Sequence, residues 1–472
     1  RVLFRSIMGV AVAVGAGIFS IGAQAAAFHA GPAVVLSFLI AGVVCGAAVM
    51  CYAEFASMIP VAGSAYTFTY TTVGEIVAWV IGWDLILEML MAGSVVSKYW
   101  GVYLNQFFEL IGWNINTNIA IGSFNFDLAP VIIVAFFTAL LVMGTKIGAR
   151  VDGALTILKI AIVVFIVVVG FFYIKAENFT PFIPPSEPAA STDGSGVSAV
   201  MEQPLWQWAT GMAPSIYGVT GIISGAALVF FAFLGFDVVA TASEETINPK
   251  KNVPLGIGVG LGLIIVLYTL VAIVTTGMVS YKDLAKQSDP SLAVAFKMVG
   301  ADWAAKIISL GIVIGMATVV MVLLLGLTRV VFAMSRDGLL PRGLSHTGKH
   351  GTPVRLQIIV GVVMALIAAC CNVGILSDMV NIGTLSAFTL VAISIPIMRK
   401  KRPDLERSFK IPGNPWVPIL IALANLWLMV NLSVLTWIRF VVWLIVGFAI
   451  YFGYGYRHAR LGAGELEVAA QE

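Results

Sequence analysis

The sequence predicts an all-helical integral membrane protein, and three observations lead to that fold class. Hydrophobic residues make up 60% of the 472 residues, whereas only 11% carry a formal charge. The mean hydropathy is +0.99. Apolar runs of about 20 residues, the length that crosses a bilayer as a helix, recur along the whole chain. A soluble protein has no interior large enough to bury so much apolar surface.

Apolar runs separated by polar breaks predict about twelve membrane-spanning helices. Their expected ranges are 7–28, 33–55, 76–101, 129–145, 155–174, 219–242, 255–279, 303–333, 356–372, 377–398, 416–435 and 438–456. We divide the chain into five spans in 1–174, an outer loop at 175–218, five spans in 219–398, two more in 399–456 and a tail at 457–472. The outer loop is rich in Pro, Ser and Gly, so we expect no fixed fold there.

Lysine and arginine predict the orientation of these spans. With twelve spans both termini lie on one side of the membrane. That side receives 19 of the 27 basic residues and the other side receives 7, while Lys159 lies inside a span. Basic residues concentrate in cytoplasmic loops, so we expect cytoplasmic termini and a multi-pass protein of the cell membrane. The chain begins at Arg1 rather than Met, so we expect residues to precede it, and no cleaved signal peptide is evident.

Two predicted spans contain glycine near their middle, at Gly15-Ala16-Gly17 in the first and at Phe231 to Gly235 in the sixth. Small residues alone favour close helix packing. Their positions favour another interpretation, because the first and sixth spans begin two successive groups of five. Five is odd, so the second group is inverted, and paired interruptions in corresponding positions indicate the site of an inverted-repeat transporter.

Broken helices suit a zwitterionic ligand. The N-terminus of a half-helix offers free N–H groups and partial positive charge to an anion. The C-terminus of a half-helix offers free carbonyl groups to a cation. A ligand with both charges a few ångströms apart, such as an α-amino acid, fits a pair of such breaks.

Several short motifs follow one another along the predicted spans. They are Gly15-Ala16-Gly17-Ile18-Phe19, Tyr52-Ala53-Glu54-Phe55, Pro60-Val61-Ala62-Gly63-Ser64-Ala65-Tyr66, Gly82-Trp83, Glu244-Glu245 with Asn248-Pro249 and Pro254, Ser335-Arg336-Asp337-Gly338 and Asn381-Ile382-Gly383-Thr384-Leu385. Together they resemble the amino acid–polyamine–organocation superfamily, most closely the cationic amino acid transporter family and its bacterial members. The resemblance implies the five-plus-five inverted repeat of the bacterial leucine transporter class. It also implies amino acid transport, often coupled to protons.

Site residues follow from the same resemblance. The amides of Gly15, Ala16 and Gly17, with Ile18 beside them, would hold the substrate carboxylate. The carbonyl groups of Phe231, Ala232 and Leu234 would hold the ammonium group, and Phe231 would cover the pocket. Leu323 lies where relatives trim the pocket, and leucine there would favour small substrates.

Lys159 is a charged residue inside the fifth span. One interpretation is snorkelling, in which the ammonium group reaches the lipid headgroups along its own stem. The other is proton coupling, because an intramembrane ionisable residue is a functional candidate. Proton-coupled relatives resemble this chain in having a lysine there, and Thr318 in the eighth span is a possible partner.

Asp84 and Glu88 lie one turn apart in the third span. They either form structural hydrogen bonds or, at Glu88, recognise a cationic side chain. The sequence therefore leaves two substrate classes open: a cationic amino acid such as Arg, Lys or ornithine, and a small neutral amino acid. Asp237, Glu244 and Glu245, and likewise Glu54, are either gate-closing ion pairs or plain interface charges.

Other functional classes receive less support from the sequence. We find no catalytic residues and expect no metal, no cofactor and no nucleic acid partner. The expected partners are the amino acid substrate and membrane lipid. We expect a proton gradient to drive transport, and the sequence does not reveal whether an accessory subunit exists. An exchanger of the same fold and a non-transporting sensor are the alternatives. Sensors usually add a long cytoplasmic domain, and the tail here has only about 15 residues, so we favour transport.

Overall fold

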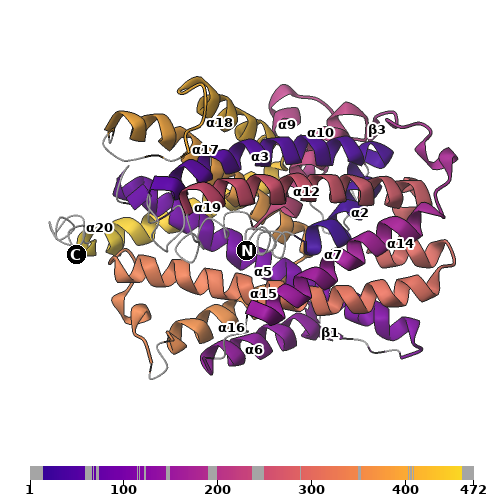
Figure 1. Cartoon of the computed structure of the whole chain (residues 1–472), viewed down its shortest axis with the longest axis horizontal. Helices are drawn as coiled ribbons and strands as arrows, with labels where there is room; N and C mark the ends of the chain where they lie inside the picture. Colours follow the sequence, from indigo (N-terminus) through magenta and orange to yellow (C-terminus); the bar gives the residue numbers. More distant parts are fainter. Residues whose placement is uncertain are drawn as a thin grey trace.

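A computed structural model describes residues 14–58, 66, 69–70, 74–113, 115, 117–121, 124–144, 149–189, 199–235, 249–287, 289–348, 352–401, 403, 407 and 409–459. Within them the chain is mostly helical, and the long helices lie side by side, approximately parallel to the long axis of the molecule (Figure 1). The C-terminal helix lies at one end of this bundle, and α14 and β3 lie at the other.

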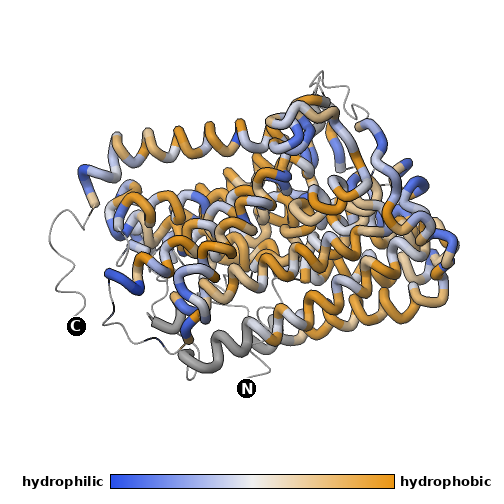
Figure 2. Tube along the Cα trace, turned by 90° about the horizontal axis from the view of Figure 1, so that it is seen from above, coloured by the Kyte–Doolittle hydropathy of each residue, from blue (hydrophilic) through white to orange (hydrophobic). Residues whose placement is uncertain are grey.

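The helices have the length and composition of membrane spans. Among the described residues, seven are long and apolar enough to cross a membrane. These are Gly17–Phe55, Glu75–Leu110, Ala154–Phe171, Gly258–Met278, Asp302–Arg336, Val373–Lys401 and Val434–His458. Four shorter apolar helices accompany them. Hydrophobic residues run along the helices and hydrophilic residues gather at the helix ends, as Figure 2 shows. The protein is therefore a multi-pass membrane protein.

The first half of the chain has a broken helical stretch followed by four helices. The broken stretch is η1 (Gly17–Ile21), α2 (Gly22–Ala25) and η2 (Ala26–Ala30), with the turn η3 (Gly31–Ala33) after it. The four helices are α3 (Val34–Met58), α5 (Glu75–Leu110), α6 (Leu128–Val142) and α7 (Ala149–Phe171). A hairpin of β1 (Asn118–Ile121) and β2 (Phe124–Asp127) precedes α6.

The second half is also mostly helical. It contains α10 (Gly218–Val229) with η5 (Phe230–Phe233), then α12 (Pro249–Met278), α13 (Tyr281–Leu284), α14 (Leu292–Met298), α15 (Asp302–Arg336), η7 (Arg342–Ser345), α16 (Val354–Cys370) and α17 (Val373–Lys401). The chain ends with α18 (Trp416–Met429), α19 (Val434–Ile450), η8 (Tyr451–Gly455) and α20 (Tyr456–His458).

Every predicted span overlaps one of these helical stretches, but the boundaries differ. The helices α5 and α15 contain 36 and 35 residues. The helix α5 extends well past the predicted range 76–101, whereas α15 nearly coincides with 303–333. Hydropathy marks only the apolar part of a helix, and the C-terminal part of α5 is more polar.

Glycines let helices from the two halves approach closely. A Cβ atom on Gly42 of α3 would lie 2.8 Å from Ile265 of α12. Gly326 of α15 meets Met89 of α5, and Gly361 of α16 meets Thr138 of α6. Small residues at such crossings are the usual means of packing helices in a membrane.

The expectation of no fixed fold in 175–218 is wrong for the residues that the structure describes there. They form η4 (Ala176–Phe179), β3 (Glu187–Pro188), α8 (Ala199–Glu202), α9 (Leu205–Thr210) and β4 (Ser215–Ile216), and β3 pairs with β4. The amides of Leu205 and Trp206 donate to the carbonyls of Leu432 and Val430. Composition does not reveal these tertiary hydrogen bonds, which hold the segment on the turn between α18 and α19.

Candidate substrate site

The first predicted break is a helix start. Val14 and Gly15 are not helical, Ala16 has helical dihedral angles, and η1 begins at Gly17. Its N-cap residue, Ala16, forms no capping hydrogen bond through its side chain. The first amides of a helix have no intrahelical carbonyl partner, so this end presents N–H groups and partial positive charge.

Tyrosine hydroxyls support the wide turns that follow. Both η1 and η2 are π-helical. The hydroxyl of Tyr103 on α5 donates to the carbonyl of Phe19, and that of Tyr217 donates to the carbonyl of Ala27. These bonds fix the outer part of the broken stretch against its neighbours.

The second predicted break is a helix end. The α-helix stops at Val229, a 3-10 turn covers Phe230–Phe233, and Leu234 is extended, with ψ of 148°. Gly235 has φ of 104°, a conformation that favours glycine. The side-chain amide of Asn381 donates to the carbonyl of Leu228 over 3.1 Å and so stabilises the change of helix type.

The two breaks touch each other. A Cβ atom on Gly17 would lie 2.3 Å from the Cα atom of Ala232, which is closer than real Cβ atoms approach backbone. Only glycine therefore fits at position 17 while the second break keeps its place. The N–H end of one half-helix and the carbonyl end of the other consequently lie side by side.

A small cavity of about 20 Å³, room for about one water molecule, lies at this contact. Its lining residues come from both breaks and from two long helices: Gly15, Ala16, Gly17, Ala92, Val96, Phe231, Leu234, Val319 and Leu323. Every lining side chain among the described residues is aliphatic or aromatic. The polar groups available to a ligand are therefore the backbone groups of the two breaks.

The structure brings most predicted site residues together. Gly15, Ala16, Gly17, Phe231, Leu234 and Leu323 line the cavity, and Ile18 and Ala232 adjoin it in the chain. The sequence interpretation missed Ala92, Val96 and Val319. Helical spacing offered a signal, because Ala92 and Val96 follow Glu88 at intervals of four residues, and Val319 precedes Leu323 by four.

Lys159 lies beside the cavity wall rather than in it. The residue is 3% exposed, and its stem packs on Gly315 of α15, where a Cβ atom would lie 3.0 Å from the lysine Cγ. The hydroxyl of Thr318 donates to the carbonyl of Gly315 over 2.9 Å. A snorkelling lysine exposes its ammonium group, so this burial argues against that interpretation.

Asp84 and Glu88 are buried in α5, at 0% and 1% exposure. The hydroxyl of Ser386 on α17 donates to Asp84 Oδ2 over 2.7 Å, so Asp84 forms a structural hydrogen bond to a neighbouring helix. Glu88 lies one helical turn from Ala92 and outside the lining residues.

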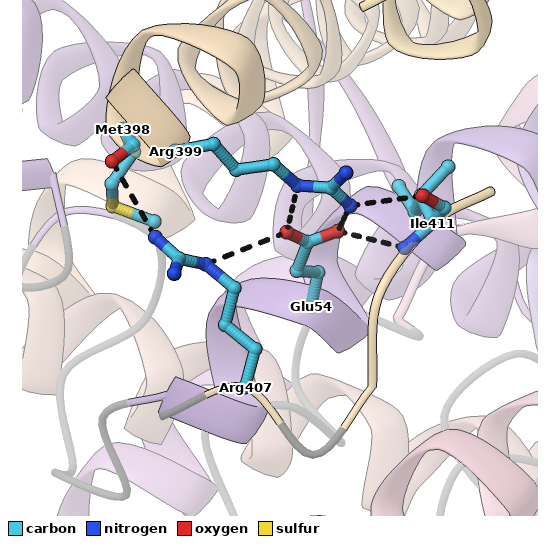
Figure 3. A network of polar contacts seen from close by, with 5 residues as sticks. All are labelled: Glu54, Met398, Arg399, Arg407 and Ile411. Atoms are coloured by element: carbon cyan, nitrogen blue, oxygen red, sulfur yellow. Dashed lines mark hydrogen bonds and ion pairs between the residues drawn. The ribbon is translucent and has the colours of Figure 1, made fainter. Parts of the chain in front are cut away.

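Glu54 is the centre of a buried ion network at the end of α3 (Figure 3). Arg399 at the end of α17 binds both carboxylate oxygens, over 2.8 and 2.6 Å. The amide of Ile411 donates over 2.9 Å, and Arg407 Nε lies 3.9 Å away. The network therefore joins α3 to α17 and to the segment after it. Asp237, Glu244 and Glu245, which share the gate interpretation, lie outside the described residues.

Comparisons with known proteins agree with this architecture. Residues 3–452 match the family described as amino acid permease. The chain is 40% identical to the methylthioribose transporter of Bacillus subtilis, over 97% of this chain and 93% of the relative. It is also 40% identical to the branched-chain amino acid permease BcaP of the same organism, over 97% and 92%.

Cationic transporters are also among the relatives. The cationic amino acid transporter 2, vacuolar, of Arabidopsis thaliana is 36% identical over 84% of this chain and 59% of the relative. The resemblance to the amino acid–polyamine–organocation superfamily is thus confirmed, and this family contains permeases rather than enzymes. A match over nearly the whole length shows that the chain belongs to the amino acid permease family.

Proposed function

We propose that the protein is a secondary active transporter that takes up neutral, apolar L-amino acids together with protons. The observation that carries this proposal is the chemistry of the cavity. Backbone groups of two broken helices provide places for a carboxylate and an ammonium group, and apolar side chains form the remaining walls. A zwitterion with an aliphatic side chain matches both parts.

The position of Glu88 bears on the choice between neutral and cationic substrates. A cationic side chain needs a carboxylate within hydrogen-bond reach, because burial of an unpaired charge is costly. Ala92 and Val96, not Glu88, present their side chains to the cavity. The names of two relatives, the branched-chain permeases of Bacillus subtilis and Lactococcus lactis, point in the same direction.

We further propose that the chain is an inverted repeat of 1–174 and 219–398, joined by the outer segment 175–218 and followed by 399–456 and the tail 457–472. Helices in corresponding positions support it, because α3 packs on α12, α5 on α15, α6 on α16 and η1 on η5. The third members are also nearly equal in length, at 36 and 35 residues. The excess of basic residues supports twelve crossings, cytoplasmic termini and a place in the cell membrane.

Lys159 is our candidate for the proton-coupling residue, with Thr318 near it. Its stem lies between α7 and α15, and Gly315 is one turn from Val319 in the cavity wall. A buried ionisable group beside a substrate cavity can change its protonation as the surrounding helices move. An imposed proton gradient would then drive accumulation of the substrate.

The test is uptake of labelled leucine into proteoliposomes that are acidic outside and neutral inside. We expect the wild-type protein to accumulate leucine. Lys159→Ala should lose gradient-driven accumulation but retain counterflow into preloaded vesicles. Lys297→Ala is the matched control, because that lysine is half-exposed and pairs with Glu109 on the surface. Undiminished gradient-driven uptake by Lys159→Ala would contradict the coupling role.

The same vesicles separate the alternatives. Arginine uptake that exceeds leucine uptake and fails in Glu88→Gln would replace the neutral substrate by a cationic one. Uptake that requires a preloaded amino acid would identify an exchanger. Ligand-induced thermal stabilisation without any uptake would identify a sensor. Competition by methylthioribose as strong as that by leucine would overturn the zwitterion argument, because this sugar thioether has neither charge.

A further inference from the structure

Two glycines form a groove on the face of α15 that meets α7. Gly311 and Gly315 are one helical turn apart, so they lie on the same side of the helix. A Cβ atom on Gly311 would collide with the Ile162 side chain of α7, at 1.9 Å from its Cδ1 atom. At Gly315 the neighbours are the Cγ, Cε and Cδ atoms of Lys159, at 3.0, 3.4 and 3.7 Å.

The two glycines face different kinds of side chain on α7. Gly311 accommodates an aliphatic side chain that packs between the two helices. Gly315 accommodates the hydrocarbon stem of a lysine along most of its length, since three successive parts of the stem lie within 4 Å of the missing side chain. The absence of a side chain at position 315 thus sets the path of Lys159 across α15.

We propose that Gly315 is a positioning residue for Lys159, and this inference rests on the proton-coupling role proposed above. Gly315, Val319 and Leu323 follow one another at intervals of four residues along α15. The last two line the cavity. The hydroxyl of Thr318 binds the Gly315 carbonyl and so anchors the backbone next to the lysine stem. The groove therefore places the lysine one turn from the residues that the substrate touches.

A methyl group at position 315 displaces the stem rather than the backbone. The nearest atoms belong to a flexible side chain, and a contact of 3.0 Å needs a shift of only a few tenths of an ångström. We therefore expect Gly315→Ala to fold. Misplacement of a functional group by about 1 Å can cost up to about a hundredfold in rate. A smaller shift should still weaken coupling while leaving the cavity intact.

The experiment compares Gly315→Ala with Gly311→Ala, which places the same methyl group on the same helix against Ile162 instead of the lysine. Gradient-driven uptake and counterflow of labelled leucine are measured in proteoliposomes, and their ratio reports coupling. We expect the ratio to fall about tenfold in Gly315→Ala. In Gly311→Ala we expect a changed melting temperature with an unchanged ratio, because only packing is affected.

An unchanged ratio in a well-folded Gly315→Ala protein would overturn the inference. Equal losses of ratio in both glycine variants would overturn it as well, because they would indicate a general packing effect. If Lys159→Ala keeps full gradient-driven uptake, the proposed coupling role itself fails, which is a separate result.

A low yield of folded Gly315→Ala protein would also be informative. Combining it with Lys159→Ala removes the stem that the methyl group meets. Recovered abundance of the double variant would support the contact as we describe it. Continued failure would show that Gly315 serves other packing, and the positioning role would be rejected.

Discussion

At the scale of single residues, Gly17 matters to both the fold and the candidate site, because it lies at the contact between the two breaks. A methyl group there would lie 2.3 Å from the backbone of Ala232. Backbone cannot move aside as a side chain can. Gly17→Ala should therefore push the two breaks apart and lower stability by about 1–3 kcal/mol, the usual cost of overpacking.

Ligand-induced thermal stabilisation tests whether the separated breaks still bind substrate, because a ligand that binds the native state raises its melting temperature. We expect leucine to stabilise the wild-type protein and not Gly17→Ala. Gly46→Ala is the control, since its methyl group would meet only the Leu261 Cδ2 atom, at 3.1 Å. Normal stabilisation of Gly17→Ala by leucine would show that the contact between the breaks is dispensable.

Residues of the site differ in how far the sequence could reveal them. Gly15, Gly17 and the run from Phe231 were predictable because a glycine or an aromatic cluster interrupts an otherwise apolar helix. For Ala92, Val96 and Val319 the four-residue spacing from Glu88 and Leu323 was the signal, but it does not suffice, because a small aliphatic residue in a membrane helix can face lipid, another helix or a cavity with the same local pattern. Only the packing of α5 and α15 around the breaks distinguishes these cases.

At the scale of helices and segments, Glu54 joins three parts of the chain. Its side chain is 1% exposed and binds Arg399, Arg407 and the Ile411 amide. Removal of one partner from a buried ion pair leaves the other charges uncompensated, at a cost of about 3–5 kcal/mol. We expect Glu54→Gln to lower the melting temperature of the purified protein markedly.

The matched control is Glu109→Gln, since Glu109 pairs with Lys297 on the surface and both side chains are at least half exposed. Exposed pairs contribute about 0–1 kcal/mol, so its melting temperature should hardly change. Equal melting temperatures of the two variants would mean that the Glu54 network adds no stability. A loss of uptake at normal stability would instead favour the gate interpretation.

Helices and loops also differ in predictability. Hydropathy locates the helices because lipid requires long apolar runs with internally bonded backbone, and each expected span overlaps a helix. The segment 175–218 was misjudged for the opposite reason. Its structure depends on bonds such as Leu205 N to Leu432 O, which connect residues more than two hundred positions apart and leave no trace in local composition.

At the scale of the whole molecule, the packing of helices agrees with the inverted repeat that we propose. Two inverted groups would bring like positions together at their centre, and the two breaks do meet at the cavity. In the proposed repeat the site would follow from the topology, and a ligand there would touch both halves. Relative movement of the halves would expose it to either side of the membrane.

Orientation in the membrane is the remaining property of the whole molecule, and cysteine labelling tests it. Lys286, in the turn after α13, has a 73% exposed side chain and is expected outside the cell. His458 is exposed at the end of α20 and is expected in the cytoplasm. Each is replaced by cysteine in a Cys370→Ser background, because Cys370 is the exposed native cysteine among the described residues.

A membrane-impermeant maleimide should label Lys286→Cys in intact cells, and His458→Cys only after permeabilisation. The reverse pattern would place the basic loops outside, and labelling of both in intact cells would mean an even number of crossings between them.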